Sequence, residues 1–213
     1  MRKIILGFLM ILTMSILSGC GMSEEDASAY VKASLDAAYK GEFEDFVEIT
    51  DSTPEGAQAI YEENIIHTME AAGFSNMELS DELTQKYKQL FLDISYAANY
   101  VVGDAKESDD GGYDIEVEIY PLILFSEISE DVITEAVIDR INGMDKYPGE
   151  KKITEITFEE IYNILSEKVN EPEYSEEKST VTVSIHKNEK GMYYISEEDM
   201  LHLDKVMFEL NKK

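Results

Sequence analysis

Basic residues are scarce in this sequence. Its 213 residues include 18 Lys and Arg against 45 Asp and Glu, which gives a formal net charge of −27. Nucleic-acid binding depends on neutralising phosphates with Lys and Arg, and attachment to anionic lipid headgroups needs the same residues. The composition therefore excludes a nucleic-acid partner and a purely electrostatic hold on a membrane. Hydrophobic residues make up 44% of the chain, which is enough to form a folded core.

Cysteine is nearly absent, and tryptophan is missing altogether. The single cysteine, Cys20, excludes an internal disulfide and any zinc or iron–sulfur centre held by several cysteines. The sequence also lacks the Gly-x-Ser-x-Gly elbow, the Walker phosphate loop, the dinucleotide-binding glycine fingerprint and the HExxH metalloprotease motif. Because no catalytic constellation is recognisable, we predict a protein that is not an enzyme and has no cofactor or metal site.

An apolar run is present at the N-terminus. Arg2 and Lys3 precede the apolar stretch 4–17, which is shorter than the ~20 residues that a helix needs to span a bilayer. This arrangement predicts a secretory signal peptide over residues 1–19. The sequence Leu-Ser-Gly-Cys at 17–20 resembles the lipobox of bacterial lipoproteins. That resemblance implies cleavage before Cys20 and a diacylglyceryl group on the Cys20 sulfur.

A lipid anchor would fix both the location and the domain boundaries of the mature protein. Two or more acyl chains hold a protein stably on a membrane, whereas one chain is marginal. Residues 20–22 would then form the lipidated N-terminus and a short tether, and 23–213 a single extracytoplasmic domain. The predicted location is the outer face of the cell membrane, and the membrane is a partner through Cys20. The alternative is an ordinary secretory signal with a chance cysteine.

Helical spacing of apolar residues predicts most elements of the domain. The predicted helices begin at residues whose side chains can cap a first turn: Ser23, Thr53, Ser80, Ser129, Thr157 and Ser196. Glycine or a Pro-Gly pair follows several of these stretches and marks their ends. Thr157 together with Glu160 matches the reciprocal capping box and therefore predicts a helix that starts at this pair.

Two β-hairpins interrupt the helices. Apolar and acidic residues alternate strictly over 113–119, which predicts a strand with one wet face, and 99–105 is its predicted partner across a Gly-rich turn. A second hairpin is predicted from the strands 181–185 and 192–195. Because a lone hairpin is marginally stable, we expect one antiparallel sheet of about four strands packed against several helices, an α+β fold. Two small domains divided near 125–128 are the alternative.

This order of elements resembles a group of uncharacterised Gram-positive lipoproteins. The segments that carry the resemblance are AYVKASLDAAYKGEF at 29–43 and VTVSIHKNEKGMYYIS at 181–196. The second segment is also similar to the closing hairpin of cystatin-like and NTF2-like α+β domains. The resemblance implies a domain of that fold with a lipid anchor, and it carries over no catalytic residue.

Acidic pairs and histidines are the other candidate site residues. The turn at Asp109-Asp110 fails the calcium-loop pattern in either glycine register, so a solvated turn is the expected structure. Glu63 and His67 lie four residues apart on one helix, where a surface pair is expected. His186 and His202 could approach each other near the last strand and helix.

Three further groups of residues have an ordinary structural explanation. Glu116 and Glu118 could perform acid–base work, but with 45 acidic residues in the chain such a pair carries no information. The acidic runs 24–26 and 197–199 are expected in the first turns of helices, where negative charge complements the helix dipole. Three tyrosines at helical spacing could line a pocket, although the expected place for them is the core: Tyr30, Tyr39 and Tyr61.

The sequence leaves three classes of function open. The first is a membrane-anchored, non-catalytic binding or interaction module whose partner is an envelope protein. The second is a small-solute or peptide-binding lipoprotein with a pocket between the sheet and the helices. The third is an envelope hydrolase with an unrecognised carboxylate site. The anchor and the missing catalytic motifs favour the first.

Overall fold

A computed structural model describes residues 21–71, 73–74, 77–109, 111–124, 129–188 and 192–208. The predicted signal peptide at 1–19 and the predicted lipidation site, Cys20, lie outside the described residues.

The strands form one antiparallel sheet in the order β1-β2-β3-β4. These strands are Tyr100–Glu107, Tyr113–Ile119, Ser179–Lys187 and Tyr193–Ile195. The two predicted hairpins are joined at their middle because β2 pairs with β3 over its whole length, from Tyr113 opposite Ile185 to Ile119 opposite Ser179. The α+β class and the four-stranded antiparallel sheet predicted from the sequence are confirmed.

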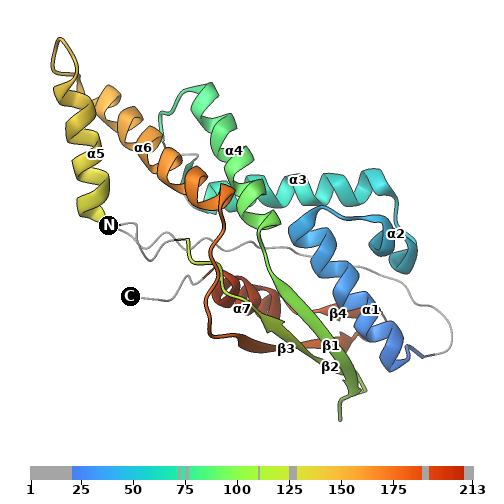
Figure 1. Ribbon diagram of the computed structural model, residues 1–213. Coiled ribbons are helices and arrows are strands. Elements are labelled where there is room, and N and C mark those ends of the chain that lie inside the picture. Colours follow the sequence, from blue (N-terminus) through green and yellow to red (C-terminus); the bar gives the residue numbers. More distant parts are fainter. Residues whose placement is uncertain are drawn as a thin grey trace.

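Helices cover the apolar face of this sheet. Helix α1 (Glu24–Leu35) packs mainly on β1 and β2, and α7 (Glu197–Met207) packs on β3 (Figure 1). Alternate residues of β2 and β3 are buried beneath them: Ile115, Val117, Ile119, Val181, Val183 and Ile185. The intervening residues of β2 are acidic and face solvent, as the alternation predicts. A buried core therefore lies between the sheet and these two helices.

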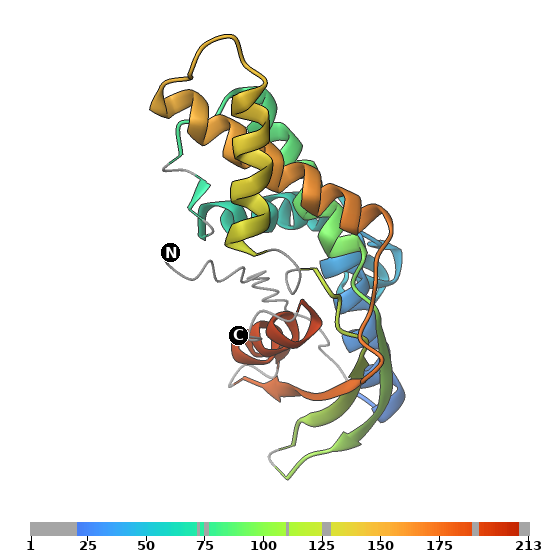
Figure 2. The same cartoon turned by 60° about the vertical axis from the view of Figure 1, so that its left-hand side comes forward.

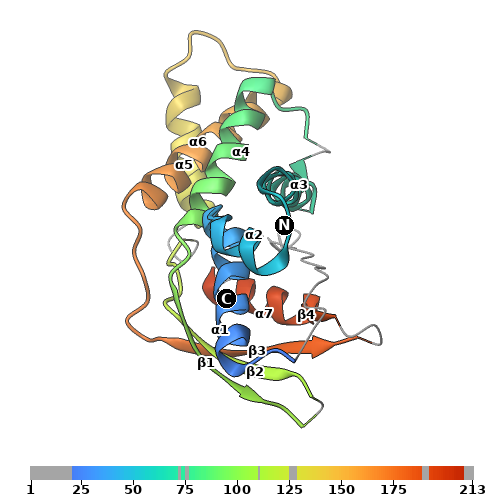
Figure 3. The same cartoon turned by 90° about the vertical axis from the view of Figure 1, so that its right-hand side faces the viewer.

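The remaining helices form a second layer at one end of the sheet. They are α2 (Glu44–Thr50), α3 (Pro54–Ala71), α4 (Asp81–Tyr96), α5 (Glu130–Asn142) and α6 (Glu150–Asn170). Figure 2 shows α5 and α6 rising away from the sheet, and Figure 3 shows α4 between them and α3. An aromatic cluster around Tyr87 and Phe158, whose rings lie 6.1 Å apart, joins α4 to α6. The Tyr87 hydroxyl also donates to the Phe158 carbonyl at 2.7 Å.

The caps predicted at Ser23, Ser80, Ser129 and Ser196 are confirmed, because each hydroxyl accepts a hydrogen bond from the first turn. The prediction at Thr157 is wrong, since α6 begins after Gly149 and Thr157 lies inside it. The Thr157 hydroxyl donates to the Ile153 carbonyl one turn earlier, at 2.9 Å. A hydroxyl that can cap a helix can also bond backward within one, so the residue type alone does not mark a start.

Candidate functional site

The wet face of the sheet carries the acidic candidates from β2. Glu118 accepts hydrogen bonds from Lys178 at 2.8 Å and from the Tyr120 hydroxyl at 3.0 Å. These two bonds, the one from Lys178 first, lower the pKa of the Glu118 carboxyl. A general acid needs a raised pKa, so the lowered pKa does not suit Glu118 to that role, and the structure shows it as a surface ion-pair partner of Lys178. Glu116 is exposed on the same face.

The structure separates the candidate histidines. His186 lies on the wet face of β3, where its ring centroid is 5.7 Å from that of Tyr194. His202 is an exposed residue of α7, which covers the opposite face of the sheet. On α3, His67 Nε2 lies 3.7 Å from Glu63 and its Nδ1 lies 3.3 Å from Glu70, and all three side chains are more than half exposed. The structure therefore shows the surface pair expected at Glu63 and His67.

The acidic turn after β1 closes on its own backbone. The Ser108 amide donates to the Gly112 carbonyl at 3.0 Å, and the Gly111 amide donates to the Ser108 carbonyl at 3.1 Å. Asp109 is exposed there, and Asp110 lies outside the described residues. Throughout the part of the chain that the structure describes, no three His, Cys, Asp or Glu side chains gather closely enough to hold a metal ion.

The tyrosine stripe belongs to the core. Tyr30, Tyr39 and Tyr61 are 4%, 1% and 9% exposed. The Tyr39 hydroxyl donates to the buried Asp204 carboxylate at 2.7 Å, which links the π-helical turn after α1, Asp36–Lys40, to α7. Burial, followed by the nearby Asp204 charge, raises the pKa of Tyr39 well above its usual value. These side chains hold elements together instead of lining a pocket.

A polar cluster that the sequence did not reveal surrounds a π-helical turn, Asp36–Lys40, which continues α1. The Asp36 carboxylate accepts from the Tyr100 hydroxyl at 2.6 Å and from Lys32, and the Lys40 amine lies 3.8 Å away. Burial alone would raise the pKa of Asp36, but the bonds from Lys32 and Tyr100 outweigh it, so this pKa is lowered. Gly41, at φ +64°, ends the turn in the left-handed region that favours glycine.

The most prominent exposed apolar surface lies on α5 and the loop after it, residues 130–149, which we term the α5 arm. Seven large hydrophobic residues are exposed in the described part of the chain, and four belong to this arm: Val132 at 44%, Ile138 at 50%, Met144 at 39% and Tyr147 at 81%. The other three are scattered over α3, α4 and β1: Ile66, Tyr96 and Val101. Because four of these seven residues belong to one element, we take the α5 arm as the candidate interaction surface.

Within the part of the chain that the structure describes, α6 is the one helix that α5 packs against extensively, so much of the α5 arm is exposed. Val137 is the buried residue of α5, and Arg140 reaches across to α6. The Arg140 guanidinium donates to Glu160 at 2.6 Å and also bonds Glu159. The apolar stripe of α5 is wider than one neighbouring helix can cover, so Val132 and Ile138 on its flanks remain in solvent.

The end of the α5 arm also differs in charge from the rest of the molecule. The loop that ends the arm and the first residues of α6, 143–152 together, contain three lysines and two acidic residues in a chain of net charge −27. Met144 and Tyr147 therefore stand at a nearly neutral tip. Acidic partners would meet less repulsion here than elsewhere on the surface.

A shallow hollow between α3 and α4 is a second surface feature. Ile66, Met69 and Phe74 form its apolar wall, with Glu70 and Lys88 among the polar lining residues. Its volume of about 290 Å³ lies at the lower limit of ligand pockets, which measure ~300–1,000 Å³. The second class of function left open by the sequence would use a pocket between the sheet and the helices, whereas this hollow lies between two helices.

Comparison with known proteins gives one structural match. No protein-family model matches the chain, and no curated protein sequence matches it significantly. Among the helices of the described residues, none combines the length and apolar character needed to cross a membrane. The crystal structure of a candidate lipoprotein (ycdA) from Bacillus subtilis matches with a TM-score of 0.55 and 19% sequence identity.

The match covers 86% of this chain and 56% of that protein, so this chain spans little more than half of its structural neighbour's length. At this identity the likeness establishes a shared fold and nothing finer. The cystatin-like or NTF2-like subtype stays a prediction. The chain is therefore an α+β protein that shares its fold with a candidate Gram-positive lipoprotein.

Proposed function

We propose that this protein is a lipid-anchored extracytoplasmic module that binds an envelope protein and has no catalytic activity. The anchor is supported by residues 17–20, whose cysteine is the single one in the chain, and by the lipoprotein description of the structural neighbour. The observation that carries the binding role is the exposed apolar surface of the α5 arm. Envelope proteins with a complementary apolar patch are the partners that such a surface fits.

The lipid anchor is tested by changing its attachment residue. In the native chain, Cys20 would carry acyl chains, and each buried CH₂ contributes about 0.8 kcal/mol to membrane binding. Cys20→Ala removes the acceptor sulfur, so the variant should lose incorporation of an alkyne-labelled fatty acid and should leave the membrane pellet. Ser18→Ala keeps a small residue in the motif and is the matched control. Equal membrane retention of both variants would contradict the proposal.

The binding role is tested by photocrosslinking in intact cells. A benzophenone amino acid at position 147 replaces Tyr147, the most exposed of the large hydrophobic residues. The matched control replaces Tyr96, which is 65% exposed on α4 and lies outside the α5 arm. We expect a discrete covalent adduct from position 147 and none from position 96. Adducts at both positions, or at neither, would contradict a partner on this arm.

A small-solute or peptide binder is the second candidate function, and the hollow between α3 and α4 favours it. A thermal-shift screen of residues 22–213 with apolar amino acids, short peptides, sugars and divalent metals tests this function. Ligand at 100 times its Kd stabilises a protein by about 2.7 kcal/mol. A rise in Tm that Phe74→Ala abolishes would support this candidate, and a flat screen would favour the protein partner.

A further inference from the structure

Met22 is the first core residue in the part of the chain that the structure describes. This side chain is 6% exposed and belongs to the core. Its carbonyl accepts a hydrogen bond from the Tyr113 hydroxyl at the start of β2. The next residue, Ser23, exchanges capping-box hydrogen bonds with Asp26 at the start of α1. The chain is therefore fixed to both α1 and β2 from Met22 onward.

The tether in front of Met22 is very short. One residue, Gly21, separates Met22 from Cys20, and a Cβ added at Gly21 would meet no atom within 4 Å. Two steps between consecutive Cα atoms span at most ~7 Å. We infer that the end of the domain around Met22 lies against the surface of the bilayer. This inference rests on the lipid anchor at Cys20 in the proposed function.

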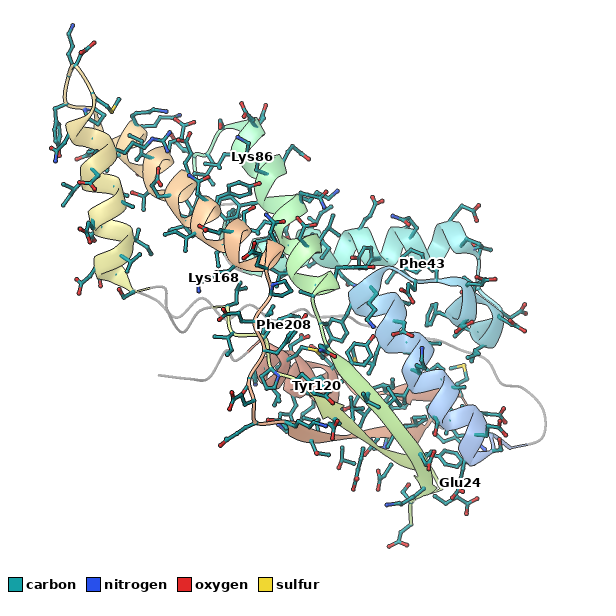
Figure 4. All side chains as sticks on the ribbon, viewed as in Figure 1. Glu24, Phe43, Lys86, Tyr120, Lys168 and Phe208 are labelled. Carbon is teal, nitrogen blue, oxygen red and sulfur yellow. The ribbon has the colours of Figure 1, made fainter. Side chains whose placement is uncertain are left out.

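The membrane-facing end is built from the start of α1 and the turn between β1 and β2. Figure 4 shows Glu24 beside that turn, where its carboxylate accepts a hydrogen bond from the Glu107 amide at 3.4 Å. Asp109 is exposed at the same turn. The partner of this surface is the lipid headgroup layer, and the acyl anchor has to hold it there against electrostatic repulsion from anionic lipids.

The short tether fixes which end of the molecule faces the bilayer, and electrostatic repulsion keeps the rest of the acidic body away from it. The acidic body cannot lie flat on an anionic surface without bringing many carboxylates within a Debye length, ~8–10 Å at physiological salt. The α5–α6 loop lies at the end of the molecule opposite to the β1–β2 turn in Figures 1, 2 and 3. The 21 residues of α6 alone extend over about 32 Å. The domain therefore stands upright and presents Met144 and Tyr147 away from the membrane.

Fluorescence quenching on vesicles tests this orientation with the full lipidated chain. Single cysteines replace Asp109 at the β1–β2 turn or Tyr147 on the α5 arm, and each carries a donor dye because lipid occupies the native Cys20 sulfur. The vesicles contain phosphatidylcholine and phosphatidylglycerol with an acceptor dye on the headgroup. We expect strong quenching of the donor at position 109 and several-fold weaker quenching at 147. Equal quenching at the two positions would overturn the orientation.

A longer tether provides the second measurement. Inserting 20 Gly and Ser residues after Gly21 gives a flexible linker with a mean span of about 25 Å. We expect this insertion to reduce quenching at position 109 strongly, because the domain can then move away. Unchanged quenching would overturn the inference that the short tether holds this end. Protein that fails to co-float with the vesicles would instead contradict the lipid anchor of the proposed function.

Discussion

At the scale of single residues, Asp36 shows how this protein keeps a carboxylate in its interior. The residue is 6% exposed, yet it accepts hydrogen bonds from Lys32 and Tyr100. Buried charge is tolerated when it is paired and hydrogen-bonded, and losing one donor leaves the carboxylate partly unsatisfied. This cluster therefore joins α1, its π-helical turn and β1 into one unit.

Tyr100→Phe should destabilise the protein by about 1–3 kcal/mol, because the ring remains but the hydroxyl donor to Asp36 is lost. Urea unfolding followed by circular dichroism measures this change. Tyr120→Phe is the matched control, since the Tyr120 hydroxyl bonds the surface residue Glu118, and its effect should stay within about 0.5 kcal/mol. Similar losses in both variants would contradict a special role for the interior bond.

The lowered pKa of Asp36 predicts a pH dependence of stability. A folded-state pKa below the ordinary 3.8 means that the unfolded chain binds the proton more readily. The ionised carboxylate therefore contributes stability above about pH 4, and this contribution is lost as the pH falls through the lowered value. Urea unfolding at several pH values measures the difference in free energy of unfolding between the native protein and Asp36→Asn. We expect this difference to be smallest at low pH, to increase as the pH rises, and to become constant above pH ~4. A constant difference would contradict the assignment.

At the scale of elements, Arg140 couples α5 to the body of the protein. Its guanidinium bonds Glu159 and Glu160 of α6, while the side chain stays 41% exposed. Arg140→Gln should speed amide hydrogen exchange in α5 severalfold, and the global free energy of unfolding should fall by no more than ~1 kcal/mol because exposed pairs are weak. Lys152→Gln breaks a pair within α6 and is the control. Unchanged exchange in α5 would contradict this coupling.

Gly103 tests the irregular pairing of β1 with β2. The register shifts between Val102 and Ala105, and a Cβ at Gly103 would lie 2.9 Å from the Glu116 carbonyl oxygen. Backbone cannot move aside cheaply in a paired strand, so Gly103→Ala should cost about 1–3 kcal/mol in thermal or urea unfolding. At Gly143, whose φ is −77°, an added Cβ would make ordinary van der Waals contact with the Arg140 carbonyl oxygen at 3.5 Å, so Gly143→Ala should be nearly neutral. If the two variants lose equal stability, strands β1 and β2 can move apart enough to accommodate the added Cβ.

The sequence predicts the elements of this fold well where capping and periodicity agree. Ser23, Ser80 and Ser196 stand at true helix starts, and alternation in β2 identifies its buried face. The prediction fails at Thr157. Its hydroxyl could have capped the start of a helix, but it donates instead to the carbonyl one turn earlier within the same helix. The π-helical turn could not be predicted either, because it is five residues long and ends at Gly41, so no later turn of the same helix reveals a shifted apolar pattern.

The candidate site is harder to predict than the fold. The pattern at Val132, Val137 and Ile141 predicts an amphipathic helix, but it does not say how many neighbours will cover that helix. That Val137 is buried while Val132 is exposed depends on the position of α6, which is a tertiary property. Acidic residues and histidines drew attention in the sequence because of their chemistry, yet the structure places Glu63 with His67 and Glu118 with Lys178 in ordinary surface pairs.

At the scale of the whole molecule, charge is the dominant property. A net charge of −27 leaves many carboxylates without a basic partner, because the chain holds 18 Lys and Arg. Mutual repulsion of like charges destabilises a compact state and keeps separate copies apart. This argues against self-association through most of the surface and leaves the nearly neutral tip of the α5 arm as the place where contact costs least.

This repulsion predicts that salt stabilises the protein. Raising NaCl from 0.01 M to 0.15 M shortens the Debye length from ~30 Å to ~8 Å, so repulsion between distant carboxylates is largely screened. The Tm from differential scanning calorimetry should rise, by about 2–4 °C for each 1 kcal/mol gained in a chain of this size. Glu116→Gln removes one exposed charge from the wet face of the sheet and should raise Tm at low salt more than at high salt. A Tm that falls as salt increases would mean that surface pairs such as Lys178–Glu118 outweigh the net repulsion.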